Sequence, residues 1–287
     1  MSDALATATP WPWTWTADGA PAGAVVVGAS GGLGAAFVEA IVAHGGFATV
    51  LALSRSGPVD FDVDAGANDG PAAGAAAPGG PASTRAAPAG TRLVRGRVDV
   101  TDEPSVARAA ALAASLAPPR LVIVATGLLH APDGLRPEKS LSMLDPARLA
   151  RLFAVNATGP ALVAKHLLPR MPRQGRASFA AVSARVGSIS DNRLGGWYGY
   201  RASKAALNML LRCAAIEWAR TARDGVCVGL HPGTVDTALS APFQGNVADG
   251  KLFTPAHSAA RLLDVLARLG PAESGRVFAW DGAEVPA

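Results

Sequence analysis

From residue 24 onward, continuous apolar runs alternate with stretches whose apolar residues repeat at helical spacing. Uninterrupted apolar strands between helices are typical of a parallel sheet that helices cover on both faces. The pattern predicts strands at residues 24–28, 47–54, 93–98, 120–125, 177–183, 226–231 and 276–280, and helices at residues 32–44, 103–116, 145–169, 199–221 and 255–269. We therefore expect an α/β fold: a doubly wound parallel sheet of the Rossmann type in one three-layer α/β/α domain over residues 23–287.

Two segments do not fit this alternation. Residues 1–22 carry three tryptophans between prolines and threonines, without a period, and are expected to form a disordered leader or to pack on the domain or at a subunit contact. Residues 57–91 are dominated by Ala, Gly and Pro. Such a segment buries too little apolar surface to offset its ordering entropy, so we expect a disordered low-complexity insertion.

Composition and charge exclude several classes of protein. The 26 basic and 22 acidic residues give a formal charge of +4 without a basic run, which argues against a nucleic-acid surface. The two cysteines lack metal or redox spacing, so no metal site is expected and a reducing cytoplasm fits. The N-terminal region lacks a basic segment followed by a long apolar core, so neither secretion nor a membrane span is expected.

The first strand runs into a glycine-rich turn, AVVVGASGGLG at residues 24–34, with Gly28, Gly32 and Gly34 in G-x-x-x-G-x-G spacing. Glycines let a pyrophosphate approach the backbone, and the helix that follows presents unpaired N–H groups and the positive end of its dipole. We therefore expect a dinucleotide to bind at this turn.

The end of the second strand indicates which dinucleotide binds. An acidic residue there would accept hydrogen bonds from a ribose 2′-hydroxyl and repel a 2′-phosphate, but this chain has Ser54 followed by Arg55. A guanidinium pairs with phosphate through charge-assisted hydrogen bonds, so Arg55 favours NADP(H) over NAD(H). The alternative is a solvated arginine at a strand end.

Tyr200 and Lys204 lie four residues apart at the start of a predicted helix, in GGWYGYRASKAALN at residues 195–208. Four residues is about one turn, so both side chains share one helix face, and an ammonium beside a phenol is expected to lower the phenol pKa. Tyr200 is therefore the candidate proton donor or acceptor. Tyr198 has Ala202 rather than a lysine four residues on, and is assigned to substrate contact or packing.

The glycine turn and the Tyr-Lys pair together resemble the short-chain dehydrogenase/reductase family over about residues 23–282. The stretch GSISDNRLGGWYGYRASKAALN is similar to the C-factor and sniffer-type carbonyl reductase branch. This resemblance implies further cofactor contacts at Ser30, Leu33, Asp99, Val100, Ala125, Thr126, Gly127, Pro232, Gly233, Val235 and Thr237, with Tyr200 and Lys204 also touching the cofactor. It also implies a mobile substrate lid at residues 236–252.

The resemblance adds two catalytic positions, one of which departs from the family. Asn156 matches the family asparagine beside a water that links the lysine to solvent. The serine that binds the substrate carbonyl stands three residues before a glycine in the family, and here that position is Ala184, with Ser183 one residue upstream. Adjacent strand residues face opposite sides, so Ser183 substitutes only if the strand end bulges. Ser188, Ser190 or no serine at all are the alternatives.

These observations predict an NADP(H)-dependent oxidoreductase that transfers hydride between nicotinamide and an aldehyde, ketone or alcohol. The resemblance implies a homodimer or homotetramer that forms through two long helices. The alternative is a cofactor-binding, C-factor-like signalling or regulatory protein with little turnover, which the missing serine also allows.

Overall fold

The computed structural model describes residues 21–58, 62–64 and 90–287. The strands of its main sheet are β1 (Gly23–Val27), β2 (Thr49–Ser54), β3 (Asp62–Asp64), β4 (Arg92–Arg97), β5 (Pro119–Val124), β6 (Ala177–Val182), β7 (Gly225–His231) and β10 (Val277–Ala279). They lie in the order β10-β7-β6-β5-β1-β2-β4-β3. All pairs are parallel except β3 with β4. The predicted doubly wound fold is confirmed.

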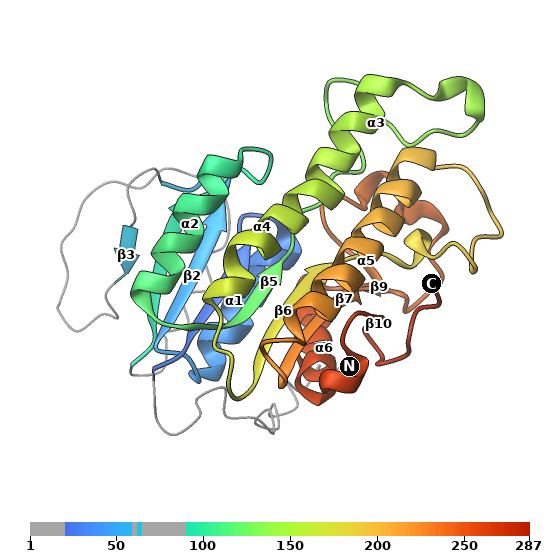
Figure 1. Ribbon diagram of the computed structural model, residues 1–287. Helices are drawn as coiled ribbons and strands as arrows, with labels where there is room; N and C mark the ends of the chain where they lie inside the picture. The colour runs from blue at the N-terminus through green and yellow to red at the C-terminus, as the bar shows by residue number, and fades with distance from the viewer. Residues whose placement is uncertain (1–20, 59–61, 65–89) are drawn as a thin grey trace, which may run out of the picture.

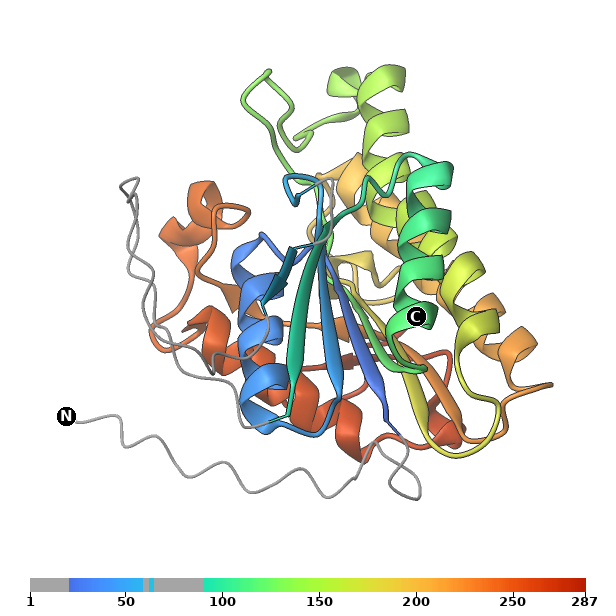
Figure 2. The same cartoon turned by 90° about the vertical axis from the view of Figure 1, so that its left-hand side faces the viewer.

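Helices cover both faces of the sheet, as Figures 1 and 2 show. One face carries α1 (Gly32–His44) and α6 (Pro255–Arg268), and the other carries α2 (Glu103–Leu116), α4 (Gly159–Leu167) and α5 (Tyr198–Trp218). Strand β1 supplies both cores, since Val25 and Val27 pack on the α2 side while Ala24 and Val26 pack on the α1 side. This explains the continuous apolar runs.

Chain order reverses between β1 and β5. From β1 the chain proceeds outward through β2 and β4, and then returns to β5 on the other side of β1 before continuing to β6, β7 and β10. In open parallel sheets, the crevice outside the carboxyl ends at such a switch point is where ligands bind. The residues expected to carry chemistry follow these carboxyl ends.

Two predicted segments differ from the structure. The helix predicted at 145–169 is α3 (Pro146–Phe153), a π-helical turn at Ala154–Thr158 and then α4. Within the insertion predicted to be disordered, Asp62–Asp64 pair with Leu93–Arg95 of β4, so that prediction is wrong for these residues, because a free sheet edge offers backbone partners to a passing chain. Residues 59–61 and 65–89 of the insertion, and the leader to residue 20, lie outside the described residues.

Short elements lie at both edges of the sheet. At the carboxyl edge are the 3-10 turns Leu141–Met143, Arg185–Gly187 and Ala241–Asn246, and the small strands β8 (Thr234–Val235) and β9 (Leu252–Phe253), which pair with each other. The 3-10 turns Leu168–Arg170 and Pro271–Glu273 follow α4 and α6 and precede the amino ends of β6 and β10. The predicted lid therefore contains the turn Ala241–Asn246 and is tied back by β9.

Candidate active site

The α5 helix, which carries the Tyr-Lys pair, begins with an unusual backbone. Gly195, Gly196 and Trp197 all have positive φ, and Trp197, at 52°, is the only non-glycine among the described residues to do so. The buried Glu138 secures this turn, because its backbone carbonyl accepts from Trp197 N at 2.5 Å and its Oε2 accepts from Gly199 N at 3.1 Å. The strained turn thus fixes the start of α5, just before Tyr200.

Tyr200 and Lys204 lie together on the buried face of α5, as predicted. Their exposed fractions are 7% and 2%, and Lys204 Nζ lies 5.8 Å from the Tyr200 ring centroid. Lys204 Nζ donates to the carbonyl of Val182, the last residue of β6, at 2.9 Å. Gly187 packs so closely that a Cβ there would lie 2.7 Å from Lys204 Cβ. The sheet end and α5 therefore hold the lysine in place.

The expected lowering of the Tyr200 pKa is wrong for this structure. Burial raises the pKa of Tyr200 to about 12 and lowers that of Lys204 to about 8. Removal from water disfavours the charged form of each group, and this outweighs the attraction of an ammonium nearly 6 Å from the ring. At neutral pH Tyr200 is therefore a protonated phenol.

Asn156 lies in the π-helical turn and is fully buried. Its Oδ1 accepts from Leu128 N at 2.7 Å and its Nδ2 donates to Leu128 O at 2.8 Å and Ser203 Oγ at 3.0 Å. Ser203 Oγ in turn donates to the carbonyl of Tyr200 at 2.8 Å. The side chain of Asn156 thus joins the loop after β5 to α5. A π-helical turn often marks a functional site, and this one was not visible as a break in the apolar period.

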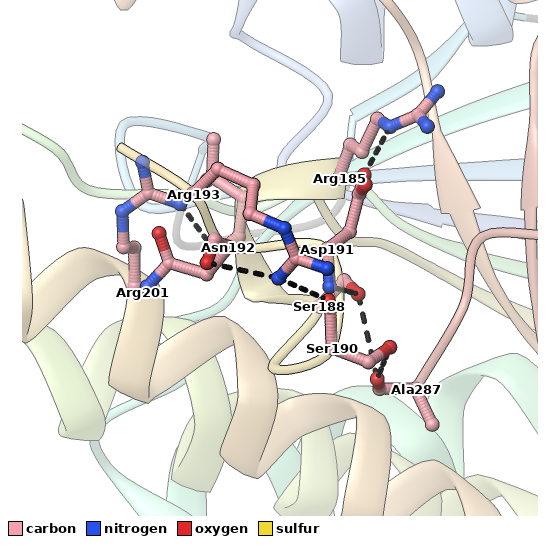
Figure 3. Close-up of polar contacts among 9 residues, drawn as sticks. Arg185, Ser188, Ser190, Asp191, Asn192, Arg193, Arg201 and Ala287 are labelled. Carbon is pink, nitrogen blue, oxygen red and sulfur yellow. Dashed lines mark hydrogen bonds and ion pairs between the residues drawn. The ribbon is translucent and has the colours of Figure 1, made fainter. Parts of the chain in front are cut away.

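The candidate serines are all engaged with other groups. Ser183 Oγ donates to Asn208 Oδ1 at 2.6 Å and is buried, whereas Ser188 Oγ and Ser190 Oγ both donate to the carbonyl of Ala287 (Figure 3). Ala184 is half-buried, with extended backbone at φ −148°. A role for Ser183 in binding the carbonyl stays a prediction, and it requires the bond to Asn208 to break.

The glycine turn has the geometry expected for a pyrophosphate site. Gly28 has φ 90°, and a Cβ there would lie 2.9 Å from the backbone of Ala125. A Cβ on Gly34 would lie 2.1 Å from the carbonyl of Gly28. Ser30, Gly32 and Leu33 complete the turn at the start of α1, where Ser30 and Gly32 are exposed. Only glycine fits at positions 28 and 34, because the turn, helix and neighbouring strand approach too closely for a side chain.

The loop after β5 contains a buried polar atom that suits a bound nucleotide. Thr126 Oγ1 is buried and has no hydrogen-bond partner among the described residues. Thr126 N would lie 3.0 Å from a Cβ on Gly28, so this threonine adjoins the glycine turn, with Ala125 before it and Gly127 after it. An unpartnered buried hydroxyl is costly. A cofactor ribose at this edge would supply the missing partner.

Arg55 and Asp99 follow neighbouring strands at the same edge. Arg55 is exposed, and Asp99 accepts from Thr101 Oγ1 at 2.7 Å and from Thr101 N at 2.9 Å. These bonds, with a smaller contribution from the charge of Arg55, keep the pKa of Asp99 below its usual value. Val100 is buried beside it. Asp99 does not cap α2 through its side chain, since Asp102 occupies the N-cap position.

The loop after β7 lies against the glycine turn. A Cβ on Gly32 would lie 2.9 Å from Thr237 Cγ2, so the two segments meet directly. Pro232 is held by Ser258, whose Oγ donates to its carbonyl at 2.9 Å, and Val235 is buried in β8. Gly233 has φ 75° and touches the Phe253 ring. The predicted cofactor residues thus gather at one edge of the sheet.

Sequence reasoning missed the aromatic cluster beside Tyr200. The Trp197 ring stands edge-on to Tyr200, with centroids 6.2 Å apart, and packs on Phe243 of the lid at 4.9 Å. His130 approaches Phe243 from the other side at 5.8 Å, and its Nε2 contacts the carbonyl of Ala238 at 3.0 Å. The only sequence signal was the run Gly195-Gly196 before an aromatic residue, which permits the left-handed turn.

Comparison with known proteins places this geometry in a family. The short chain dehydrogenase family matches residues 81–247, more than half of the chain. The chain belongs to the short-chain dehydrogenase family. It is 39% identical over 147 residues to the C-signal of Myxococcus xanthus, covering 51% of this chain and 83% of the relative. It is 32% identical over 229 residues to a cis-4-hydroxycyclohexanecarboxylate dehydrogenase of Sinomonas cyclohexanicum, covering 78% and 77%.

Solved structures agree with this placement. The NADPH-bound carbonyl reductase from chicken fatty liver superposes with a TM-score of 0.72 at 25% identity, covering 93% of this chain and 95% of that one. The carbonyl reductase Sniffer of D. melanogaster, at 17% identity, shares the fold with a TM-score of 0.68 over 93% and 100% of the chains. As a short-chain dehydrogenase/reductase, the protein is an oxidoreductase that acts on alcohol or carbonyl groups.

Two further results concern other kinds of site. Within the part of the chain that the structure describes, no helix is long and apolar enough to cross a membrane. The same residues contain no group of His, Cys, Asp and Glu side chains that could hold a metal ion.

Proposed function

We propose that the protein is an NADP(H)-dependent carbonyl reductase or alcohol dehydrogenase in which Tyr200 is the proton donor. The observation that carries this proposal is the buried Tyr200–Lys204 pair at the carboxyl edge of the sheet, beside a glycine turn shaped for a dinucleotide. The names of two similar relatives, the cis-4-hydroxycyclohexanecarboxylate dehydrogenase and a 1-hydroxy-2-glutathionyl-2-methyl-3-butene dehydrogenase of Rhodococcus, support a hydroxyl or carbonyl substrate.

The residues of the chain would act as follows. The bound nicotinamide supplies the hydride chemistry. Tyr200, protonated at neutral pH because burial raises its pKa, gives its proton to the substrate oxygen as negative charge develops there. Lys204, whose pKa is lowered to about 8, holds the cofactor ribose and helps return a proton to the phenolate. Asn156 fixes the loop after β5 against α5, which sustains the proton path.

We also propose a preference for NADP(H) over NAD(H). The exposed Arg55 at the end of β2 has no carboxylate within ion-pair distance among the described residues, so its guanidinium is free for a 2′-phosphate. The NADPH found in the chicken carbonyl reductase structure supports the same choice.

The direct test is NADPH oxidation by the full chain against a panel of aldehydes, ketones and quinones. Turnover that depends on both substrate and Tyr200 would establish the activity. NADPH binding without turnover on any member of the panel would contradict it.

A second candidate is a C-factor-like regulatory protein that binds the cofactor with little turnover. Ala184 in place of the carbonyl-binding serine favours it, as does the similarity to the C-signal. The same substrate panel distinguishes the reductase from the regulatory protein, because a regulatory protein should bind NADPH tightly and oxidise it negligibly.

The proposed setting is a cytoplasmic homodimer or homotetramer. Helix α5 exposes Met209, Leu210 and Ile216, at 63%, 39% and 50%, which is apolar surface that a second copy could cover. Light scattering coupled to size exclusion measures the assembly, and substituting Met209 and Ile216 by serine should dissociate it.

A further inference from the structure

A cleft of about 280 Å³ opens at the carboxyl ends of β6, β7 and β10. Its lining residues are Arg185, His231, Gly233, Thr234, Lys251, Phe253, Trp280 and Asp281. Arg185 directly follows Ala184, where the family has the serine that binds the carbonyl, and Gly233 and Thr234 belong to the loop expected to hold the nicotinamide. The cleft therefore adjoins the proposed reaction centre without containing Tyr200.

Arg185 is oriented before any ligand binds. Its Nε donates to Asp191 Oδ2 at 2.6 Å, and Figure 3 shows its terminal nitrogens directed away from that carboxylate. Asp191 is itself held, because its backbone N–H donates to Ser188 Oγ at 3.1 Å. The hydrogen bond from Arg185 lowers the pKa of Asp191, so the pair stays ionised. The free end of the guanidinium can form two parallel hydrogen bonds to an anionic group.

Lys251 brings a second cation from another segment, just before β9. Its Nζ lies 5.8 Å from the Trp280 ring centroid, and Trp280 packs edge-on against Phe253 at 4.5 Å. Among the described residues that line the cleft, Asp281 carries the only carboxylate, and its Oδ1 accepts from Ala283 N at 3.1 Å. The lining thus places two cations and one carboxylate beside an aromatic wall, while Asp191, outside the lining, pairs with Arg185 Nε.

His231 adds an unsatisfied polar group. Its Nδ1 is buried and has no hydrogen-bond partner within the described residues. Burial first, and then the charge of Arg185, lower the pKa of His231 to about 4, against an opposing effect of Asp281, so the ring is neutral at physiological pH. A buried polar atom without a partner is unfavourable, and a ligand with hydrogen-bonding groups would relieve it.

We propose that this cleft binds the carboxylate end of a ring-bearing substrate. Arg185 and Lys251 pair with the carboxylate, and the ring packs against Trp280 and Phe253. The inference rests on the proposed function, since it extends the substrate from the reaction centre into the cleft. Binding energy from this remote group would help to position a carbonyl that lacks the usual serine contact.

The test compares 4-acetylbenzoate with its neutral counterpart 4-acetylbenzamide, by calorimetric titration of the full chain with saturating NADP⁺, which carries no hydride and so lets both ketones bind without being reduced. The wild type should bind the acid at least tenfold more tightly than the amide. Arg185→Gln and Lys251→Gln should each weaken acid binding about tenfold and leave amide binding within about twofold, as expected for one charged hydrogen bond. Asp281→Asn should tighten acid binding a few-fold, because it removes a like charge.

Arg223→Gln is the matched control, since Arg223 is an exposed cation just before the amino end of β7, at the opposite edge of the sheet. If circular dichroism shows that Arg185→Gln does not fold, the affinities of Lys251→Gln and Asp281→Asn for the acid still test whether the cleft binds the carboxylate. Equal affinity of the wild type for the acid and the amide would overturn the assignment. Unchanged affinity for the acid in every variant of Arg185, Lys251 and Asp281 that folds would overturn it too. If a separate NADPH oxidation assay shows that the ketones are nevertheless reduced, the proposed function stands and only the cleft assignment fails. The predicted binding pattern without any reduction would instead support the cleft and contradict the proposed function.

Discussion

Substituting Ala184 by serine tests whether activity is limited by the missing hydroxyl that, in the family, donates a hydrogen bond to the substrate carbonyl. All three nearby serine hydroxyls are engaged, Ser183 with Asn208 and Ser188 and Ser190 with Ala287. Position 184 has extended, unstrained backbone and is only half-buried, so a serine fits there without distortion. A hydroxyl at this position would be a free donor to the substrate oxygen.

The expected gain follows from what such donors contribute elsewhere. Removing one donor to a developing oxyanion costs about 2.7 to 4 kcal/mol, and we take the lower figure because the new hydroxyl is not fully preorganised. Ala184→Ser should therefore raise kcat/KM on simple ketones by about 100-fold, with unchanged affinity for NADPH. NADPH oxidation at 340 nm measures the first quantity, and fluorescence titration measures the second.

A matched variant makes the reasoning refutable. Ser183→Ala should reduce stability by about 1 kcal/mol, because Asn208 loses a hydrogen bond, and should leave turnover nearly unchanged. If Ser183→Ala instead lowers turnover about 100-fold and Ala184→Ser has no effect, then Ser183 leaves Asn208 to bind the carbonyl, as the sequence first suggested. Ser188→Ala and Ser190→Ala serve as controls, with little change in rate expected.

Three further predictions concern the cofactor, the turn and acid stability. Arg55→Ala should weaken NADPH binding by about 1.5 to 3 kcal/mol and hardly affect NADH, whereas equal losses for both coenzymes in titration would refute the 2′-phosphate contact. Gly34→Ala should abolish cofactor binding or lower the melting temperature sharply, because its Cβ would lie 2.1 Å from the Gly28 carbonyl, and normal binding by the alanine variant would show that the turn relaxes. His231, whose pKa falls from 6.5 to about 4, gives stability that is present above pH 6.5 and is lost as pH falls towards 4. Denaturant titrations should show that His231→Gln loses about 3 kcal/mol less than the wild type between these pH values, and identical losses would place the acid sensitivity elsewhere.

Sequence patterns predicted the sheet and the residues of its carboxyl edge because both depend on local signals. Buried parallel strands such as β1 must be apolar on both faces, and the turn after β1 requires glycine at positions 28 and 34, so the sequence shows both features directly. The Tyr200–Lys204 pair was predictable for the same reason, since helical spacing alone places both on one face.

Other features depend on contacts between distant segments and left no local pattern. The direction of the Tyr200 pKa shift depends on how deeply α5 is buried, which its spacing to Lys204 does not reveal. Glu138 caps α5 from a loop 61 residues away, and the orientation of Ser183 is decided by Asn208 on another element. The pairing of Asp62–Asp64 with β4 is a backbone interaction that tolerates almost any side chain.

The central claim is that Tyr200 supplies the proton, and Tyr200→Phe tests it most directly. The variant keeps the ring that packs edge-on against Trp197 and removes only the hydroxyl. NADPH binding and melting temperature should match the wild type, while turnover on the best carbonyl of the panel falls by about 10²- to 10⁴-fold, the usual contribution of a positioned general acid. Turnover equal to that of the wild type, with the same NADPH affinity, would contradict the account.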